Sequence, residues 1–351
     1  VFMYNQDKYY MNTHLLEEIW SIDSTTFPHT GSLEEQIKFL LRYAILAPST
    51  HNSQPWLFRI DQDTCTITAD STVKLSQADP TERDLYISLG ACVENLCAAA
   101  AYYNIDTIVS YKEEKMPAIK VQFQFKEREI EKTHQSLLQA ILNRRTSRGI
   151  FEPDKLSQHV IEKIHDVQHP SNLQLHLITK EDEIEKLAHL TAQGLQMAHS
   201  SISFRKEMSK WINHSLSTKR TGIPGYSLGA PTAISFLIPL AVRFFNLGSV
   251  LAKKNYSSIA SSPAVYVITA TDNTTHTWID VGRYAERLML ILTAEKIQTS
   301  IFVAAIEMGN LAQKVQQLLD TSNTPQFLFC AGTLNTSNTP TLRYSVKEKL
   351  T

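Results

Sequence analysis

The sequence predicts an α+β protein of two units, each a mixed or antiparallel sheet flanked by helices. Its 351 residues exceed one average domain, and helical and strand patterns run along the chain in two series separated by a charged stretch near residue 130. Four residues also recur at an offset of 192: Gly90, Glu94, Leu96 and Ile105 reappear as Gly282, Glu286, Leu288 and Ile297. The alternative is that two unrelated amphipathic helices share a few residue types. We expect an N-terminal unit over residues 1–130 and a C-terminal unit over residues 131–351.

The first unit begins with a helix marked by a capping box from Ser32 to Glu35, with apolar residues at helical spacing until Pro48 ends the pattern. The later patterns predict a strand hairpin, a helix and two further strands, over residues 57–60, 64–68, 84–102, 107–111 and 117–125. Polar residues alternate with apolar ones in the last strand, which predicts one solvent-facing side.

The second unit repeats this alternation of helices and strands. The patterns predict a short helix leading to Arg144, a helix over residues 157–167, strands over 173–178, 264–270 and 326–331, and a helix over 279–296. Long helical runs fill residues 181–262. Glycines and prolines interrupt the uncharged stretch between residues 220 and 243, so we expect a loop-rich covering segment there rather than a membrane helix.

Composition excludes several classes of partner. The chain carries 34 basic and 35 acidic residues, so its net charge of −1 gives no global attraction for nucleic acid or a membrane. Four cysteines lack metal-ligand spacing and have mostly apolar neighbours, which indicates buried thiols in a reducing compartment. The first ten residues contain no apolar run of signal-peptide length, so we expect a cytoplasmic protein.

The common catalytic motifs are absent from the sequence. It contains no glycine-rich dinucleotide fingerprint, no P-loop, no nucleophile elbow and no zinc-protease motif. His159, His165 and His169 share a polar region that fits a solvated helix better than a dry ligand shell, so no metal is expected.

Residues 47–56 carry the first pattern that points to a ligand. This segment, A-P-S-T-H-N-S-Q-P-W, places small hydroxyls and two carboxamides between a buried helix and a strand. Carboxamides offer both donors and acceptors, so they can match alternating carbonyl and N–H groups such as those on a flavin ring. An ordinary polar loop is the alternative for this segment taken alone.

Residues 144–148 carry the second pattern, with three arginines and two hydroxyls in five positions. Guanidinium groups bind phosphate oxygens through paired, charge-assisted hydrogen bonds, and Ser or Thr hydroxyls complete such a cradle. The alternative is a solvated basic patch.

Both segments resemble motifs of the nitroreductase family, whose members bind FMN. The first is similar to the family's A-P-S-x-x-N-x-Q-P-W stretch, in which His51 occupies a variable position, and the second to its R-R-S/T-x-R element for the FMN phosphate and ribityl chain. The resemblance implies that FMN contacts Pro48, Ser49, Thr50, Asn52, Gln54, Arg144, Arg145, Thr146, Ser147, Arg148 and, in the segment P-T-L-R, Arg343.

Three further segments resemble the Acg-like branch of that family: residues 79–84, 144–151 and 222–229. By this resemblance the insertion at about 190–260 is a lid over the flavin. It also places Arg83 near the pyrimidine edge and the backbone of Phe302, Val303 and Ala304 near flavin N5.

The two motifs are divided between the units. The first unit has the turn but no arginine pair upstream of it, and the second has the arginine element but no second turn. In the family each flavin site is shared by two subunits. The resemblance therefore implies a nitroreductase fold duplicated in tandem, in which a monomer functions as a pseudo-dimer with one surviving flavin site, and further association stays open.

The expected function is an FMN-dependent oxidoreductase that takes electrons from NAD(P)H and passes them to a nitroaromatic or quinone-like small molecule. The flavin carries the chemistry, so no catalytic side chain is assigned. The alternative is a lid-covered FMN-binding protein that stores or sequesters flavin with little turnover.

Overall fold

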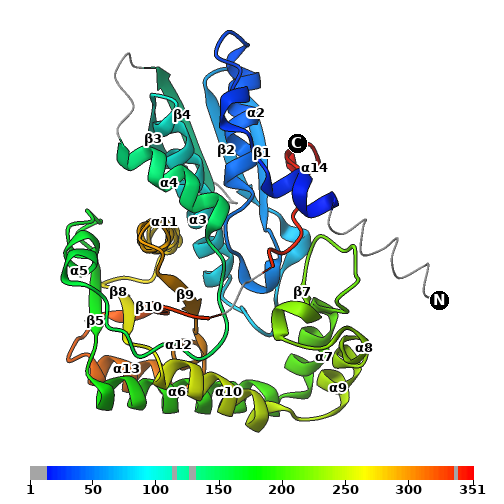
Figure 1. Ribbon diagram of the computed structural model, residues 1–351, viewed down its shortest axis with the longest axis vertical. Helices are drawn as coiled ribbons and strands as arrows, with labels where there is room; N and C mark the ends of the chain where they lie inside the picture. Colours follow the sequence, from blue (N-terminus) through cyan, green and yellow to red (C-terminus); the bar gives the residue numbers. More distant parts are fainter. Residues whose placement is uncertain (1–13, 113–116, 126–131, 336–338) are drawn as a thin grey trace.

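Two four-stranded antiparallel sheets form the framework of the computed structural model, which describes residues 14–112, 117–125, 132–335 and 339–351 (Figure 1). The first sheet has the order β1-β2-β4-β3, with β1 (Trp56–Asp61), β2 (Thr64–Ala69), β3 (Ile105–Lys112) and β4 (Ala118–Phe125). The second has the order β5-β8-β10-β9, with β5 (Leu173–Ile178), β8 (Ala264–Ala270), β9 (Gln298–Ile301) and β10 (Thr324–Gly332). Short strands β6 (Ile212–Asn213) and β7 (Ile223–Pro224) pair in parallel.

Helices surround and separate the sheets. The longer ones are α2 (Leu33–Ala44), α3 (Arg83–Tyr102), α4 (Lys132–Asn143), α5 (Gln158–His165), α6 (Glu181–Ser200), α7 (Ile202–Trp211), α10 (Gly248–Ala260), α11 (Thr275–Ala294) and α13 (Leu311–Leu318). The shorter ones are α8 (Thr232–Ser235), α9 (Ile238–Phe244), α12 (Ala304–Glu307) and α14 (Val346–Lys349), with single 3-10 turns η1 (Ser24–Thr26), η2 (Thr50–Asn52), η3 (Ser71–Val73) and η4 (Gly225–Leu228). Residues 14–20 are also helical.

The two sheets are built from the same succession of elements. In each case two strands precede a 20-residue helix and two strands follow it, and the fourth strand lies between the second and the third. The helices α6 to α10 enter between β5 and β8 of the second series. This common order agrees with the internal echo in the sequence.

The central contact between the two series is the crossing of α3 and α11. A Cβ atom added to Gly90 would stand 2.0 Å from the Ile279 carbonyl oxygen, and one added to Gly282 would stand 2.0 Å from the Ile87 carbonyl oxygen. Both pairs of positions are related by the offset of 192 residues found in the sequence. The crossing is thus reciprocal, and only glycine permits its close backbone approach.

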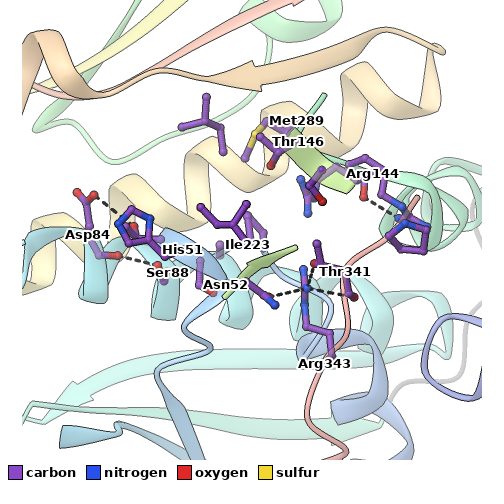
Figure 2. Close-up of a pocket in the computed structure, with 18 of the residues that line it drawn as sticks. His51, Asn52, Asp84, Ser88, Arg144, Thr146, Ile223, Met289, Thr341 and Arg343 are labelled. Carbon is purple, nitrogen blue, oxygen red and sulfur yellow. Dashed lines mark hydrogen bonds between the residues drawn. The ribbon is translucent and has the colours of Figure 1, made fainter. Parts of the chain in front are cut away.

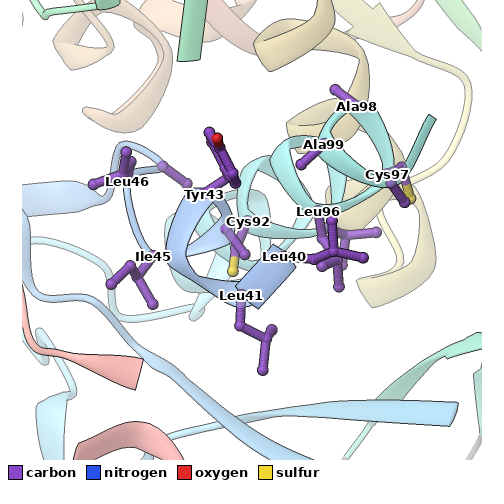
Figure 3. Close-up of a cluster of buried hydrophobic side chains, with 14 of the residues drawn as sticks. Leu40, Leu41, Tyr43, Ile45, Leu46, Cys92, Leu96, Cys97, Ala98 and Ala99 are labelled. Carbon is purple, nitrogen blue, oxygen red and sulfur yellow. The ribbon is translucent and has the colours of Figure 1, made fainter. Parts of the chain in front are cut away.

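The core of the first sheet is completed by α2 and α4. Figure 3 shows Leu40, Leu41 and Tyr43 of α2 beside Cys92 and Leu96 of α3, all of them buried. Both hydrogen bonds of the capping box that starts α2 are present, from the Glu35 N–H to Ser32 Oγ (3.3 Å) and from the Ser32 N–H to the Glu35 carboxylate (2.8 Å).

Helix α4 follows the predicted boundary at residue 130, yet its buried side chains belong to the first core: Leu137, Leu138, Ala140 and Ile141. The boundary itself stays a prediction. The C-terminal segment also returns to the first sheet, because the Thr351 N–H donates to the Phe58 carbonyl (2.9 Å) and Leu350 bridges Phe58 in parallel. This return places residues 339–345 beside the turn that precedes β1.

The predicted elements occur where the sequence placed them, with shifts of a few residues at their ends. Strands 173–178 and 264–270 match β5 and β8. Strand β9 was not predicted, because it is only four residues long and only three residues separate it from the end of α11. Its strand conformation depends on backbone pairing with β10. The stretch between residues 220 and 243, predicted to be loop-rich, also contains η4, α8 and most of α9.

One expectation about burial is confirmed. All four cysteines are buried free thiols, and burial raises the pKa of Cys65 and of Cys330 to about 12. Helix α3 is long and apolar enough to cross a membrane, but 89% of its most apolar window is buried inside the structure. Packing against α2, α4 and α11 accounts for that composition.

Replacing Gly90 or Gly282 by alanine should destabilise the fold. Each added methyl group meets a helix backbone carbonyl, and we expect a loss of roughly 2 to 3 kcal/mol of unfolding free energy for either change, measured by urea denaturation. The matched control is Gly229→Ala, whose Cβ would meet only the Lys254 side chain at 3.9 Å and which should cost about 1 kcal/mol because its φ is +72°. Losses no larger than the control's at both crossing positions would contradict the close packing.

Candidate functional site

A cavity of about 330 Å³ lies where α3, α11, the turn before β1 and residues 222–227 meet (Figure 2). Ten predicted site residues line it: Pro48, Ser49, Thr50, Asn52, Arg144, Arg145, Thr146, Arg148, Val303 and Arg343. The structure therefore brings the turn and the arginine element, nearly one hundred residues apart in sequence, to the same cavity.

The turn from Pro48 to Trp56 has an unusual backbone. Three of its non-glycine residues have φ in the left-handed region: His51 at 54°, Asn52 at 56° and Gln54 at 52°. Ser49 Oγ accepts a hydrogen bond from the Gln54 N–H (2.9 Å), which holds the turn closed. Positive φ at successive side-chain-bearing residues is unfavourable and is found mostly at functional sites.

The two carboxamides of the turn connect it to other parts of the chain. Asn52 Nδ2 donates to the carbonyl oxygens of Arg220 and Leu342 (both 3.0 Å). Gln54 is fully buried and does not line the cavity. Its Nε2 atom donates to the Arg220 carbonyl (2.6 Å), and its Oε1 atom accepts from the Tyr344 N–H (2.8 Å). The predicted ring-seating amides thus hold the covering segment and the C-terminal segment against the turn.

Arg144 is the most deeply buried of the three arginines in the element, with 3% of its surface exposed. Its Nε atom lies 3.2 Å from Oε1 of Glu286, which is fully buried on α11. Its Nη1 atom is also buried but makes no hydrogen bond within the described part of the chain. A buried guanidinium N–H without a partner is costly, so this atom marks a place for an acceptor from a ligand.

Arg343 joins this group from the C-terminal segment and is 4% exposed. Its Nη1 atom donates to Asn52 Oδ1 (2.6 Å) and to the Thr341 hydroxyl, while its buried Nε has no partner among the described residues. Burial, followed by repulsion from Arg144 and Arg145, lowers the pKa of Arg343 to about 9. The cavity therefore concentrates positive charge.

The remaining residues of the arginine element support this arrangement. Arg145 lies over the Trp20 ring at 3.9 Å, and burial together with the neighbouring Arg144 lowers its pKa to about 10. Thr146 lines the cavity and bridges Thr299 of β9. Ser147 is buried outside the cavity lining, and its N–H donates to the Thr299 carbonyl (2.8 Å). Arg148 lines the cavity and is exposed.

An apolar wall faces these charges. It is supplied by α3 and α11, whose crossing places side chains of both helices on one side of the cavity: Ile87, Ala91, Ala285 and Met289. Ile301, Val303 and Phe327 extend this wall, and Gly222, Ile223, Tyr226 and Ser227 cover it. The Tyr226 hydroxyl donates to the Pro340 carbonyl (2.9 Å), which joins the cover to the C-terminal segment.

His51 and Asp84 occupy the end of the cavity shown beside Ser88 in Figure 2. Burial lowers the pKa of His51 to about 4, so its ring is neutral at pH 7. The Thr50 hydroxyl donates to Asp84 Oδ2 (3.3 Å), and Arg83 pairs with Asp84 Oδ1 (3.0 Å). The two charged ends of the cavity are thus an arginine group and a compensated carboxylate.

Three other predicted residues lie behind the cavity lining. Arg83 pairs with Asp84 and with Glu307 (3.3 Å) rather than lining the cavity. Phe302 is buried in the core of the second sheet, and Ala304 begins α12 against Gly194. Of this backbone segment, Val303 alone lines the cavity.

Several lining residues were missed by sequence reasoning. Gly282 and Ile87 had a signal, because Gly282 belongs to the echo and Ile87 lies three residues before Gly90, the counterpart of Gly282. Glu286 also belongs to the echo, but it lies outside the lining and pairs with Arg144. Trp20, Thr341 and His51 gave no pattern that could separate them from ordinary core or loop residues. Their positions depend on contacts between segments far apart in the chain.

The cavity suits a small molecule that carries an anionic group on a flat, largely apolar body. The buried guanidiniums of Arg144 and Arg343 would contact the anion, and the α3–α11 wall would contact the apolar part. The fold and the cavity together define an α+β protein whose cavity holds buried guanidinium N–H groups without a partner among the described residues.

Comparison with curated proteins gives a short match. The sequence matches no family model. Two proteins from strains of Mycobacterium tuberculosis, each provisionally named NAD(P)H nitroreductase, are 31% identical over 78 residues. The match covers 22% of this chain and 22% of each relative, so it spans about a fifth of their length.

Comparison with solved structures finds nitroreductases of low sequence identity. The FMN-dependent nitroreductase NfnB of Mycobacterium smegmatis, in complex with NADPH, aligns with a TM-score of 0.37 and 17% identity over 58% of this chain and 89% of that one. A nitroreductase of Desulfitobacterium hafniense with bound FMN gives 0.38 and 14% over 62% and 97%. Both alignments span about three fifths of this chain.

Glu286 should make the stability of the ligand-free protein depend on pH. Burial raises the pKa of Glu286 to about 7 from 4.5, so the folded protein keeps a proton that the unfolded chain releases between these values. Glu286 therefore makes its full contribution to the unfolding free energy below pH 4.5, and this contribution is lost as the pH rises through 7. We expect a loss on the order of 3 kcal/mol between about pH 4.5 and pH 8, measured by urea unfolding.

The variant Glu286→Gln should lack this loss. Glu34→Gln, which removes an exposed carboxylate on α2, is the matched control and should keep the pH dependence of the parent protein. If Glu286→Gln kept the same dependence, the buried carboxylate would not be its source.

Proposed function

We propose that this chain is an FMN-dependent oxidoreductase that accepts electrons from NAD(P)H and passes them to a nitroaromatic or quinone-like small molecule. The observation that carries the proposal is the pair of buried guanidiniums, Arg144 and Arg343, each with an N–H that has no partner among the described residues. They stand at one end of an apolar cavity lined by the turn that resembles the family's flavin-contact motif.

The residues present fit FMN. Arg144 and Arg343 would hold the phosphate, with Arg145, Thr146 and Arg148 beside them. The α3–α11 wall would support one face of the ring, and Ile223 and Tyr226 would cover the site and exclude water. Asn52 and Gln54 act by fixing the turn to the covering and C-terminal segments.

The bound flavin would supply the hydride and electron transfer, and the protein would bind, orient and desolvate it. The match to mycobacterial proteins provisionally named NAD(P)H nitroreductase supports NAD(P)H as the donor. His51 is neutral at pH 7, and no side-chain acid or base is assigned.

We further propose that the chain is a tandem duplication of the nitroreductase fold that works as a pseudo-dimer. The shared order of elements and the reciprocal contacts of Gly90 and Gly282 support it. The turn from the first series and Arg144 from the second line one cavity, which supports one flavin site per chain. Purified protein should then contain about one FMN per chain.

FMN should bind far more tightly than riboflavin, which lacks the phosphate. Two charge-assisted contacts predict a ratio on the order of one hundredfold, measured by quenching of flavin fluorescence. Arg144→Gln should abolish most of this preference, whereas Arg59→Gln, an exposed arginine on β1, should retain it. Equal affinities for both flavins in the parent protein would contradict the phosphate site.

A second function, flavin storage under a closed lid, is favoured by the contacts of residues 220–226. Asn52 and Gln54 bind the Arg220 carbonyl, and the Tyr226 hydroxyl binds the Pro340 carbonyl. These contacts attach the cover at two of its residues, Arg220 and Tyr226. A cover that opens slowly would keep NAD(P)H from the flavin.

Anaerobic addition of NADPH to the FMN-loaded protein separates the two functions. Rapid bleaching of the flavin bands in the parent protein supports the reductase. Slow bleaching that becomes at least about tenfold faster in Tyr226→Phe, which loses the hydrogen bond to Pro340, supports storage. Slow bleaching in both the parent protein and Tyr226→Phe would contradict both proposals: electron transfer from NADPH, and a cover that the Tyr226 hydroxyl holds closed.

A further inference from the structure

The outer side of the covering segment exposes a cluster of large apolar side chains. We call it the outer lid face; it comprises Ile234, Phe236, Leu237, Leu240, Phe244, Phe245 and Val250, which are 48% to 70% exposed. The described part of the chain has only five other exposed large apolar residues, of which Ile202 begins α7. Single exposed apolar residues are common, but a contiguous group marks an interaction surface.

This cluster has a consistent place in the fold. Helices α7, α8 and α9 stand together at one corner of the molecule, and α10 leads away from them (Figure 1). Leu237, Leu240 and Phe244 are spaced three and four residues apart, so they share one side of α9, while Val242 is buried on the other. The same segment lines the cavity through Ile223 and Tyr226.

The charge of this segment differs from that of the whole chain. Residues 201–262 contain eight lysines and arginines and one acid, Glu207, in a chain of net charge −1. Glu207 is directed to the first unit, where its carboxylate accepts from the N–H groups of Gln77 and Ala78. Six cations are exposed and form no ion pair with any described residue: Lys206, Lys210, Lys219, Arg243, Lys253 and Lys254.

We propose that the outer lid face docks on an anionic lipid membrane. Protruding phenylalanines and leucines enter the boundary between headgroups and acyl chains, and the surrounding lysines and arginines attract the anionic headgroups. A second copy of this chain would bring two positively charged segments together, which repels. The expectation of no membrane partner rested on the net charge of the chain, which hides this local excess.

Co-sedimentation of the 351-residue protein with lipid vesicles tests the proposal. We expect binding to vesicles of phosphatidylcholine with about one third phosphatidylglycerol, little binding to pure phosphatidylcholine, and weakening when salt rises from about 0.05 M to about 0.5 M. The double variant Phe244→Ser, Phe245→Ser should partition at least about tenfold less. Because both rings are exposed, its thermal unfolding midpoint should match that of the parent protein.

A matched pair of single variants separates this surface from general stickiness. Leu240→Ser should weaken vesicle binding, whereas Ile108→Ser, which removes an exposed side chain from β3, should leave it unchanged. No binding to anionic vesicles, or equal binding by the double variant, would overturn the proposal. A dimer in light scattering that dissociates in the double variant, without vesicle binding, would assign the surface to a second copy instead.

Discussion

The close crossing of α3 and α11 is the constraint on which the other features of this structure depend. Gly90 and Gly282 face the carbonyl oxygens of Ile279 and Ile87, and no larger side chain fits at either position. The approach brings the cavity-lining sides of both helices together as one apolar wall. It also sets Glu286 of α11 against Arg144, whose segment is paired to β9 through Thr146.

Charge inside the cavity is not balanced by the protein alone. Arg144 and Arg343 are buried beside one fully buried carboxylate, Glu286, whose pKa burial raises to about 7. Removing a guanidinium from water costs free energy unless an acceptor or an opposite charge compensates it. We therefore infer that an anionic ligand compensates the buried guanidiniums of Arg144 and Arg343. The covering segment completes the site through Tyr226 and presents a basic, apolar surface on its other side.

Much of the fold and part of the site could be predicted from the sequence. The capping box at Ser32 and the compact apolar runs of β5 and β8 are local signals, and they gave the right elements. The two motifs could be assigned to one site only through a family resemblance. Three features of the site could not be predicted, because they depend on contacts with segments far away in the sequence. They are the hydrogen bonds of Gln54 to the covering segment, the pairing of Glu286 with Arg144 and the burial of Ser147.

The most direct test of the central claim is a crystal structure of the protein with FMN. The phosphate should lie within hydrogen-bonding distance of the Arg144 and Arg343 guanidiniums, with the ring between the α3–α11 wall and Tyr226. A phosphate bound elsewhere, or a crystal soaked in FMN whose cavity stays free of it, would contradict the claim that the buried arginines form the cofactor site.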